Sequence, residues 1–152
     1  MMIKGYQVHW KSFNELSKEE LYQLLRLRQE VFILEQDCPY IDADNTDQSA
    51  MHLLCFEGNN LVGYLRAFPE KVKYEHPSIG RVVVPISHRS KGLGVELMRE
   101  SMDYVKRHFK AKKIIISAQF RLKGFYENLG FIAVGEIYLE DNIDHIEMHY
   151  EV

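Results

Sequence analysis

The feature that most constrains the fold is a glycine-containing turn between a strand-like run and an amphipathic helix pattern. The turn, Arg89–Gly94, follows the apolar run Ile79–Val84 and leads into a helical pattern over Leu93–His108. A turn that opens a helix exposes backbone N–H groups and the positive end of the helix dipole, and both attract phosphate. Arg89 and Lys91 are unfavourable beside that end unless an anion is bound there. The pattern favours a phosphate-binding turn, although an ordinary basic turn explains the motif alone equally well.

Two common nucleotide-binding motifs do not fit this turn. A Walker A loop requires Gly-Lys followed by Ser or Thr, whereas the order here is Lys91-Gly92-Leu93. A dinucleotide fingerprint requires a third glycine or alanine three residues after Gly94, where Leu97 stands instead. A different kind of phosphate-bearing ligand is therefore expected.

Length and composition limit the remaining classes of protein. A chain of 152 residues is expected to form one domain over residues 1–152. Its net charge of −3 argues against a nucleic-acid partner, and no apolar run is long enough for a membrane span. Two cysteines, Cys38 and Cys55, make no disulfide framework, which favours a cytoplasmic location. The histidines form no helical pair with metal-ligand spacing, so no metal is expected. The oligomeric state cannot be read from the sequence.

The first predicted helix has two charged residues on its apolar stripe. Ser17 and Glu20 form a capping box, and the stripe then runs from Leu21 through Arg28 to Glu35. Buried charges need partners. One interpretation is that Arg28 and Glu35 form structural ion pairs or turn toward solvent; the other is that this end of the helix lines a polar pocket. The sequence favours neither.

The remaining elements predict an α/β fold of the mixed α+β kind, built around one sheet. A loop over residues 36–49 contains four aspartates, which either favour a cationic amine near the site or are simply solvated. The other expected elements are a hairpin of Met51–Glu57 and Leu61–Phe68, a strand Ile79–Val84, a buried strand Lys113–Ala118, a short helix Leu122–Leu129 ended by Gly130, and strands Phe131–Val134 and His145–Tyr150.

A second motif, Phe125–Phe131 (FYENLGF), lies one predicted strand after the glycine turn. In this order and at this separation, the two motifs resemble those of the Gcn5-related N-acetyltransferase (GNAT) superfamily. The resemblance extends over nearly the whole chain, toward the ElaA-like branch. The supporting residues are Arg28, Val31, Phe32, Glu35, Gln36, Cys38-Pro39-Tyr40, Arg81–Val84, Ala118-Gln119 and Asp141, Ile143, His145, Ile146 and Met148.

The resemblance implies a three-layer sandwich with a mixed, largely antiparallel sheet of about seven strands, splayed at a cofactor cleft. It implies acetyl-CoA as the cofactor, with the arm of CoA along Val82, Val83 and Val84. It places the diphosphate on the backbone of Ser90, Lys91, Gly92, Leu93, Gly94 and Val95, with charge from Arg89 and Lys91. A Cβ at either glycine is expected to block close backbone approach. Gln119 stands where many members carry an asparagine that contacts the cofactor arm.

The resemblance also implies transfer of an acetyl group to a primary amine by direct attack on the thioester. Tyr126 matches the family position whose phenol protonates the CoA thiolate and also contacts the cofactor. Glu35 and His145 are candidates for the general base, and Arg28, Glu35 and His145 are expected to contact the acceptor, which the sequence does not identify. The alternative is a non-catalytic module that binds and senses acyl-CoA.

Overall fold

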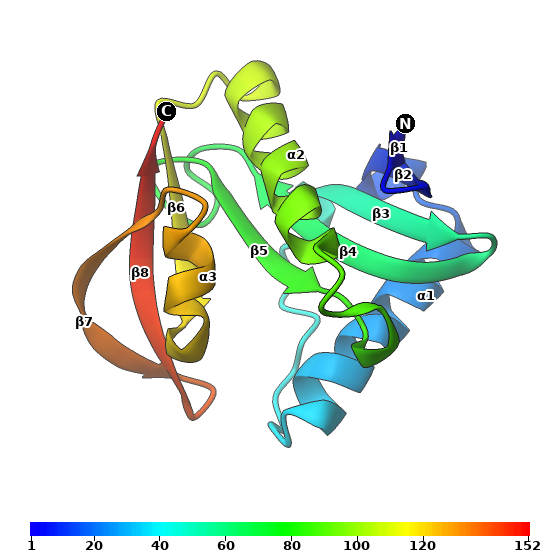
Figure 1. Cartoon of the computed structure of the whole chain (residues 1–152), viewed down its shortest axis with the longest axis horizontal. Coiled ribbons are helices and arrows are strands. Elements are labelled where there is room, and N and C mark those ends of the chain that lie inside the picture. Colours follow the sequence, from blue (N-terminus) through cyan, green and yellow to red (C-terminus); the bar gives the residue numbers. More distant parts are fainter.

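An eight-stranded sheet forms the centre of the protein (Figure 1). The computed structural model describes residues 1–152. The strands lie in the order β1-β2-β3-β4-β5-β6-β8-β7, and only the junction between β5 and β6 is parallel. Their bounds are Met2–Ile3 (β1), Tyr6–Ser12 (β2), Met51–Glu57 (β3), Asn60–Phe68 (β4), Ser78–Val83 (β5), Lys113–Gln119 (β6), Ile132–Glu140 (β7) and Ile143–Glu151 (β8).

The β5–β6 junction divides the sheet into two antiparallel halves. These two strands pair at a single position, Ser78 with Ile115, whereas β6 pairs with β8 from Lys113 to Gln119. Beyond Ser78 the strands diverge, as Figure 1 shows. A bulge also interrupts β5 where it faces β4, and Arg81 adopts a left-handed conformation there, with φ of 51°. A bulge leaves one residue out of the ladder and bends the strand. The sheet is therefore open at the β5–β6 edge.

Helices cover both faces of the sheet. α1 is Lys18–Arg28 and continues as a π-helical segment, Gln29–Glu35; α2 is Leu93–His108 and α3 is Lys123–Glu127. Neighbouring β3 residues point to opposite faces. Thus Leu53 packs in the core beneath α2 and α3, and Leu54 packs in the core beneath α1. The layers are therefore helix, sheet and helix.

Most predicted elements are present, and the first helix begins with the predicted capping box. The Ser17 hydroxyl accepts from the Glu20 N–H at 3.0 Å, and the Glu20 carboxylate accepts from the Ser17 N–H at 2.8 Å. β1 and β2 were not predicted, although the alternation Tyr6-x-Val8-x-Trp10 is a strand signal. Neither the π-helical segment nor the full length of β7 was predicted.

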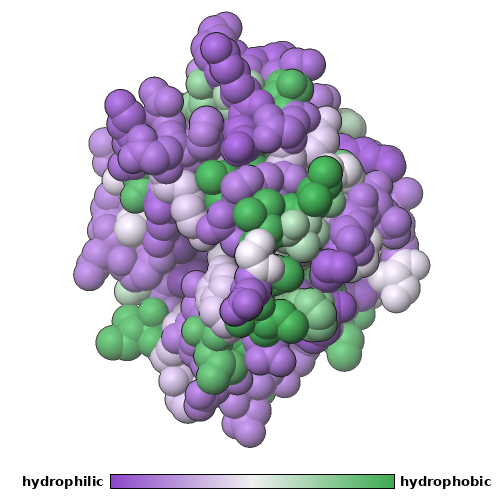
Figure 2. Space-filling model, turned by 90° about the vertical axis from the view of Figure 1, so that its left-hand side faces the viewer, coloured by the Kyte–Doolittle hydropathy of each residue, from purple (hydrophilic) through white to green (hydrophobic).

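β7 forms one edge of the sheet and is exposed over most of its length. Its exposed apolar side chains include Ile132 and Leu139, which are 68% and 67% exposed. Figure 2 faces this side of the molecule, where apolar side chains gather among polar ones. None of the helices is both long enough and apolar enough to span a membrane.

Candidate active site

The divergence of β5 from β6 opens a cavity of about 410 Å³, here called the cleft cavity. Its wall draws side chains from six parts of the chain: the π-helical segment with the loop after it, β4 with the loop after it, β5, Arg89 of the glycine turn, β6 with the segment through α3, and the β7–β8 turn with the start of β8. The predicted site residues that line it together are Val82, Val83, Val84, Arg89, Gln119, Tyr126, Glu35 and His145.

The glycine turn adjoins one end of the cleft cavity. Ser90 and Gly92 adopt left-handed conformations, with φ of 64° and 80°, and α2 begins at the next residue, Leu93. Successive turns of this kind aim backbone N–H groups at one point and form an anion-binding concavity together with the helix N-terminus. A Cβ built on Gly94 lies 4.0 Å from Val84 Cγ2, and Val84 is part of the cavity wall.

The two glycines of the turn are required for different reasons. Gly92 needs its left-handed backbone, which is strained for other residues. Gly94 has no such need, and the atoms nearest to a Cβ placed there, Phe125 Cζ and Val84 Cγ2, are at 3.9 and 4.0 Å. The protein itself therefore leaves space at Gly94, so only a ligand packed against the turn would exclude a side chain there.

Arg89 joins the glycine turn to the end of the π-helical segment. Its Nη1 and Nη2 donate to the two Glu35 carboxylate oxygens at 2.6 and 2.8 Å, and its Nε donates to the Val84 carbonyl at 2.8 Å. Both side chains are about one-third exposed. The ion pair explains the charge at Glu35 and engages both of its carboxylate oxygens.

Tyr126 lies on α3 with its ring buried in the core and its hydroxyl at the cavity. The residue is 8% exposed, and its ring packs edge-on against Phe125 and Phe131. Its phenol makes no hydrogen bond with another group of the protein, yet it is not sealed in the core, because the residue lines the cavity. Burial raises the pKa of Tyr126 to about 12. The phenol is thus a neutral donor that is free to act on a ligand.

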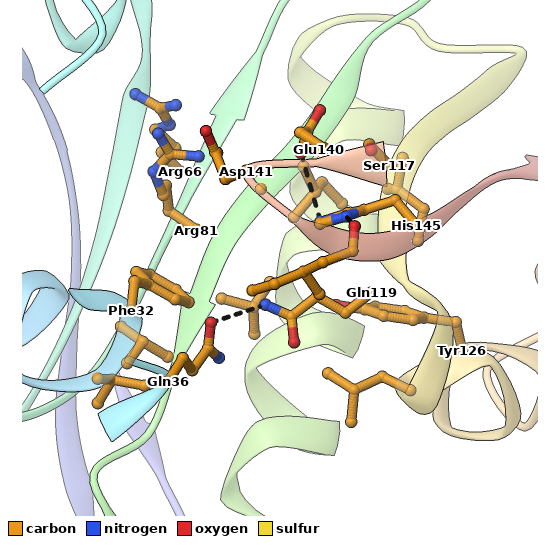
Figure 3. A pocket seen from close by; sticks show the side chains of 18 of the residues that line it. Phe32, Gln36, Arg66, Arg81, Ser117, Gln119, Tyr126, Glu140, Asp141 and His145 are labelled. Carbon is orange, nitrogen blue, oxygen red and sulfur yellow. Dashed lines mark hydrogen bonds and ion pairs between the residues drawn. The ribbon is translucent and has the colours of Figure 1, made fainter. Parts of the chain in front are cut away.

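His145 lies on β8, which pairs with β6 in the other half of the sheet from β5. A backbone contact fixes its tautomer. Its Nδ1 is 2.7 Å from the Ile143 carbonyl, and a carbonyl can only accept, so Nδ1 carries the proton. Nε2 is then the atom left to accept a proton, and it lies 3.3 Å from a carboxylate oxygen of Glu140. The Tyr138 ring stacks on the imidazole and its hydroxyl bonds Ser117. The imidazole is thus held at both ring nitrogens, by the Ile143 carbonyl and by Glu140, and Figure 3 shows the contact with Glu140.

Gln119 connects the two lips of the cleft cavity. Its Nε2 donates to the Gln36 side chain at 3.0 Å, and its Oε1 accepts from Arg121 Nε at 3.1 Å. Figure 3 shows the bond to Gln36 crossing the cavity from β6 toward the end of the π-helical segment. The amide is therefore placed within the cavity, where a ligand arm would meet it.

The structure corrects the expectation that Arg28 contacts a substrate. Arg28 is fully buried and is absent from the cavity wall. Its guanidinium donates to Asp42 at 2.6 Å and to Asp47 at 2.8 Å, from beneath the loop that carries both aspartates. A buried guanidinium requires such partners. Of the two interpretations of this charge, the structural ion pair is the right one.

The aspartate loop is likewise neither solvated nor directed at the cavity, except at exposed Asp37. Asp42 and Asp47 are each 6% exposed, and Arg66, Lys73 and Arg81 join Arg28 in binding them and Asp44. This set of four cations and three carboxylates is here called the ion-pair cluster. The ion pairs with Arg66 and Lys73 hold the pKa of Asp44 far below its ordinary value, against the opposing effect of burial.

Several residues of the cavity wall were not predicted as site residues, and they come from separate segments. They include Tyr40, Arg66, Phe68, Lys73, Tyr74, Arg81, Ser117, Phe125 and Glu140. No local pattern marks them, because only the splay and the bulge bring them together. Arg81 is a partial exception, because it immediately precedes Val82, Val83 and Val84, which were predicted to contact the cofactor arm. No group of three or more His, Cys, Asp or Glu side chains could hold a metal ion.

A splayed mixed sheet, an anion-binding turn at a helix N-terminus and a cleft with an unpaired phenol define an acyl-CoA-dependent acyltransferase site. A family model described as "Acetyltransferase (GNAT) domain" matches residues 14–152. The chain therefore belongs to the GNAT acetyltransferase family, in its ElaA-like branch.

Three relatives illustrate this placement. Protein ElaA of Escherichia coli is 39% identical, over 99% of this chain and 98% of the relative. The crystal structure of Escherichia coli ElaA has a TM-score of 0.89, and the match covers 96% of this chain and 99% of that chain. The crystal structure of an acyl-CoA N-acyltransferase from Pseudomonas aeruginosa, 37% identical, also has a TM-score of 0.89, and the match covers 95% of this chain and 99% of that chain. A GNAT family acetyltransferase from Elizabethkingia anophelis with acetyl-CoA bound shares the fold, with a TM-score of 0.66, 17% identity and coverage of 99% and 100%.

Proposed function

We propose that this protein is an N-acetyltransferase that moves the acetyl group of acetyl-CoA to a primary amine. The observation that carries the proposal is the Tyr126 phenol, which is buried on α3, free of protein hydrogen bonds and exposed only to the cleft cavity. Because the protein does not use the donor capacity of this phenol, the O–H can donate to a ligand in the cavity. The glycine turn at the other end of the cavity supplies the matching anion site.

The residues present fit acetyl-CoA. Ser90–Val95 would hold the diphosphate through backbone N–H groups, and the space at Gly94 would admit it. Val82, Val83 and Val84 would pair with the amide-bearing arm through their backbone, as one strand pairs with another. Gln119 would contact the same arm from β6. When bound, acetyl-CoA supplies a thioester whose carbonyl carbon accepts the amine and whose sulfur leaves.

The protein's own groups would supply the proton transfers. The amine must be neutral when its nitrogen forms the new bond to the acetyl carbon, because an alkylammonium with a pKa of ~10.4 has no free electron pair. A backbone N–H of the bulged β5 would stabilise the negative charge that develops on the carbonyl oxygen, worth roughly 3 kcal/mol. As the C–S bond breaks, the Tyr126 O–H would pass its proton to the sulfur.

Two groups are candidates to take the amine's proton, directly or through water. His145 is oriented by the Ile143 carbonyl and its Nε2 has a single contact, with Glu140 at 3.3 Å, whereas both Glu35 oxygens accept from the permanently charged Arg89 at 2.6 and 2.8 Å. These contacts favour His145 over Glu35. The pH–rate profiles of His145→Ala and Glu35→Gln separate them, because only loss of the base removes the ionisation on the acidic side of the profile. Unchanged profiles in both variants would contradict a side-chain base.

The competing function is a non-catalytic module that binds acyl-CoA and senses its level. Such a module would need the glycine turn and would have no use for an unpaired phenol at the reacting end of the cavity. Turnover separates the two, because a sensor binds acetyl-CoA without releasing CoA thiol in the presence of any amine.

Calorimetric titration with acetyl-CoA tests the cofactor assignment. We expect micromolar affinity in the native protein and none in Gly94→Asp, where a carboxylate would repel the diphosphate. Asp in the first turn of a helix is favourable, so the variant should remain folded. Tyr126→Phe should bind acetyl-CoA normally and lose about 100-fold in turnover. Equal affinity in Gly94→Asp would contradict the site, and equal turnover in Tyr126→Phe would contradict the acid.

A further inference from the structure

The cations and the carboxylates of the ion-pair cluster face different surroundings. Arg66, Lys73 and Arg81 all line the cleft cavity, whereas none of the three carboxylates, Asp42, Asp44 and Asp47, does. The carboxylates lie behind the cations as seen from the cavity. The cations that the aspartate loop binds, Arg66, Lys73 and Arg81, thus form a positively charged wall at this end of the cavity, here called the basic wall. The four aspartates in the sequence suggest negative charge instead.

The cluster also carries one positive charge more than it has carboxylates to neutralise. Four cations, Arg28, Arg66, Lys73 and Arg81, share three aspartates. Each cation has at least one carboxylate partner, but four positive and three negative charges leave the cluster with a net charge of +1. The excess therefore favours an anion, and the cavity is the side from which an anion can approach.

Donors remain available on that side. Arg81 uses Nε and Nη2 on Asp42, at 2.8 and 3.0 Å, while its Nη1 makes no hydrogen bond. Lys73 donates to Asp44 alone, at 3.0 Å, and its side chain is 32% exposed. Arg66 is 2% exposed and its unpartnered Nε is itself buried, so the donors available to a ligand are those of Arg81 and Lys73.

Arg81 is held in place as a binding group would be. It occupies the β5 bulge with φ of 51°, a strained conformation for a residue with a side chain. Its guanidinium lies over the Tyr40 ring, 5.7 Å from the centroid. Burial raises the pKa of Tyr40 to about 12, so that ring stays neutral and cannot replace the missing anion. A planar guanidinium fixed on an aromatic face suits a carboxylate.

The facing wall carries the opposite charge. Glu140 and Asp141, from the β7–β8 turn, line the cavity together with His145. Asp141 makes no ion pair with the basic wall, and Glu140 is paired only with His145. In Figure 3, Glu140 and His145 lie on the side of the pocket opposite Arg66 and Arg81, whereas Asp141 lies beside the two arginines, so Glu140 supplies the negative charge of the facing wall. The reacting phenol of Tyr126 is on the His145 side.

We propose that the acetyl acceptor is a small amino carboxylate, whose carboxylate binds Arg81 and Lys73 while its amine faces Glu140, His145 and Tyr126. This inference rests on the proposed acetyltransferase activity and names the substrate class for the same cavity. A molecule with both charges satisfies both walls, whereas a plain diamine would place a cation against the basic wall. The basic wall thus selects against simple polyamines.

Matched acceptors test the proposal. Glycine, β-alanine, 4-aminobutyrate and L-lysine are each compared with the corresponding carboxamide and decarboxylated amine. CoA release is measured with acetyl-CoA, and binding is measured by calorimetry on the CoA-saturated protein. We expect at least one acid to exceed its amide about tenfold or more in kcat/KM and in affinity. Amides or decarboxylated amines that match or exceed their acids throughout would overturn the proposal, as would failure of every acid to bind.

Variants assign the preference to the basic wall. In Lys73→Gln and Arg81→Gln, the acid-to-amide ratio should fall about tenfold, while affinity for acetyl-CoA is unchanged. Lys71→Gln is the matched control, because Lys71 is in the same loop and does not line the cavity. Arg81→Lys retains the charge and should restore part of the ratio if Arg81→Gln is unstable. A ratio that stays at its native value in both Lys73→Gln and Arg81→Lys/Lys73→Gln would refute the assignment.

These measurements separate failure of this inference from failure of the proposed function. Loss of the acid preference with intact acetyl-CoA binding and CoA release on plain amines leaves the acetyltransferase standing and removes the amino carboxylate. Absence of acetyl-CoA binding removes the acetyltransferase itself. Carboxylate binding is measured independently, by titration of the acids into the protein alone.

Discussion

Arg28→Met tests whether this buried guanidinium supports the fold or the substrate. The variant retains a long side chain but removes hydrogen bonds to Asp42 and Asp47 at 2.6 to 3.3 Å. Breaking a buried ion pair by removing one partner costs about 3–5 kcal/mol. The lower end applies here, because Asp42 retains Arg81 and Asp47 retains Arg66. We therefore expect a loss of about 3 kcal/mol in the free energy of unfolding.

Urea unfolding followed by circular dichroism measures this loss. With a slope of about 2 kcal/mol per molar urea, the midpoint should fall by about 1.5 M. The midpoint of thermal unfolding should fall by about 9 °C. Arg26→Met is the matched control, since Arg26 pairs with Glu30 on the exposed face of the same helix and should leave the midpoint unchanged. A fall of less than about 0.5 M in urea, together with a raised KM for the amine, would refute the structural role and restore Arg28 to the substrate site.

Three further outcomes are expected. Gly92→Ala should lower stability by about 1 kcal/mol because φ is 80°, whereas Gly94→Ala should not lower it but should weaken acetyl-CoA binding; urea unfolding and calorimetry compare the two. Burial lowers the pKa of His52 in the folded protein. As the pH falls, the unfolded chain therefore takes up a proton on this imidazole before the folded protein does. Stability should then decline as the pH falls below about 6.5, and His52→Gln should flatten that decline. With the pKa of Tyr126 raised to about 12, kcat should show no loss from its ionisation up to about pH 10; a limb near pH 9 that is absent in Tyr126→Phe would contradict the raised pKa.

Local signals in the sequence predict much of the fold. The helix Leu93–His108 has the predicted bounds, because an αL glycine begins it and an apolar stripe continues through it. The β3–β4 hairpin follows from its short turn. The π-helical segment could not be predicted in the same way, because the apolar spacing around Val31 also suits an α-helix. This segment follows Arg28, which is buried at the end of α1, and it ends at Glu35 in the cavity wall.

Only part of the candidate site could be predicted from the sequence, because many of its residues come from separate segments. Arg89 and Tyr126 belong to contiguous motifs, so their placement at one cavity follows from the order of strands and helices. The positive charge of the basic wall arises because Arg66 and Lys73, from a different part of the chain, bind Asp44 and line the cavity in its place. Four aspartates in one loop predict an acidic surface only if nothing covers them.

The single pairing between β5 and β6 has a mechanical consequence. The two halves of the sheet are hinged at Ser78 and Ile115, where the Ile115 N–H donates to the Pro77 carbonyl at 3.0 Å. Beyond that hinge, a change in the angle between the halves breaks no hydrogen bond of the β-ladder. Phe125 and Leu122 line the cavity between the two halves, so we expect substitutions there to change which acyl groups fit without breaking the β-ladder.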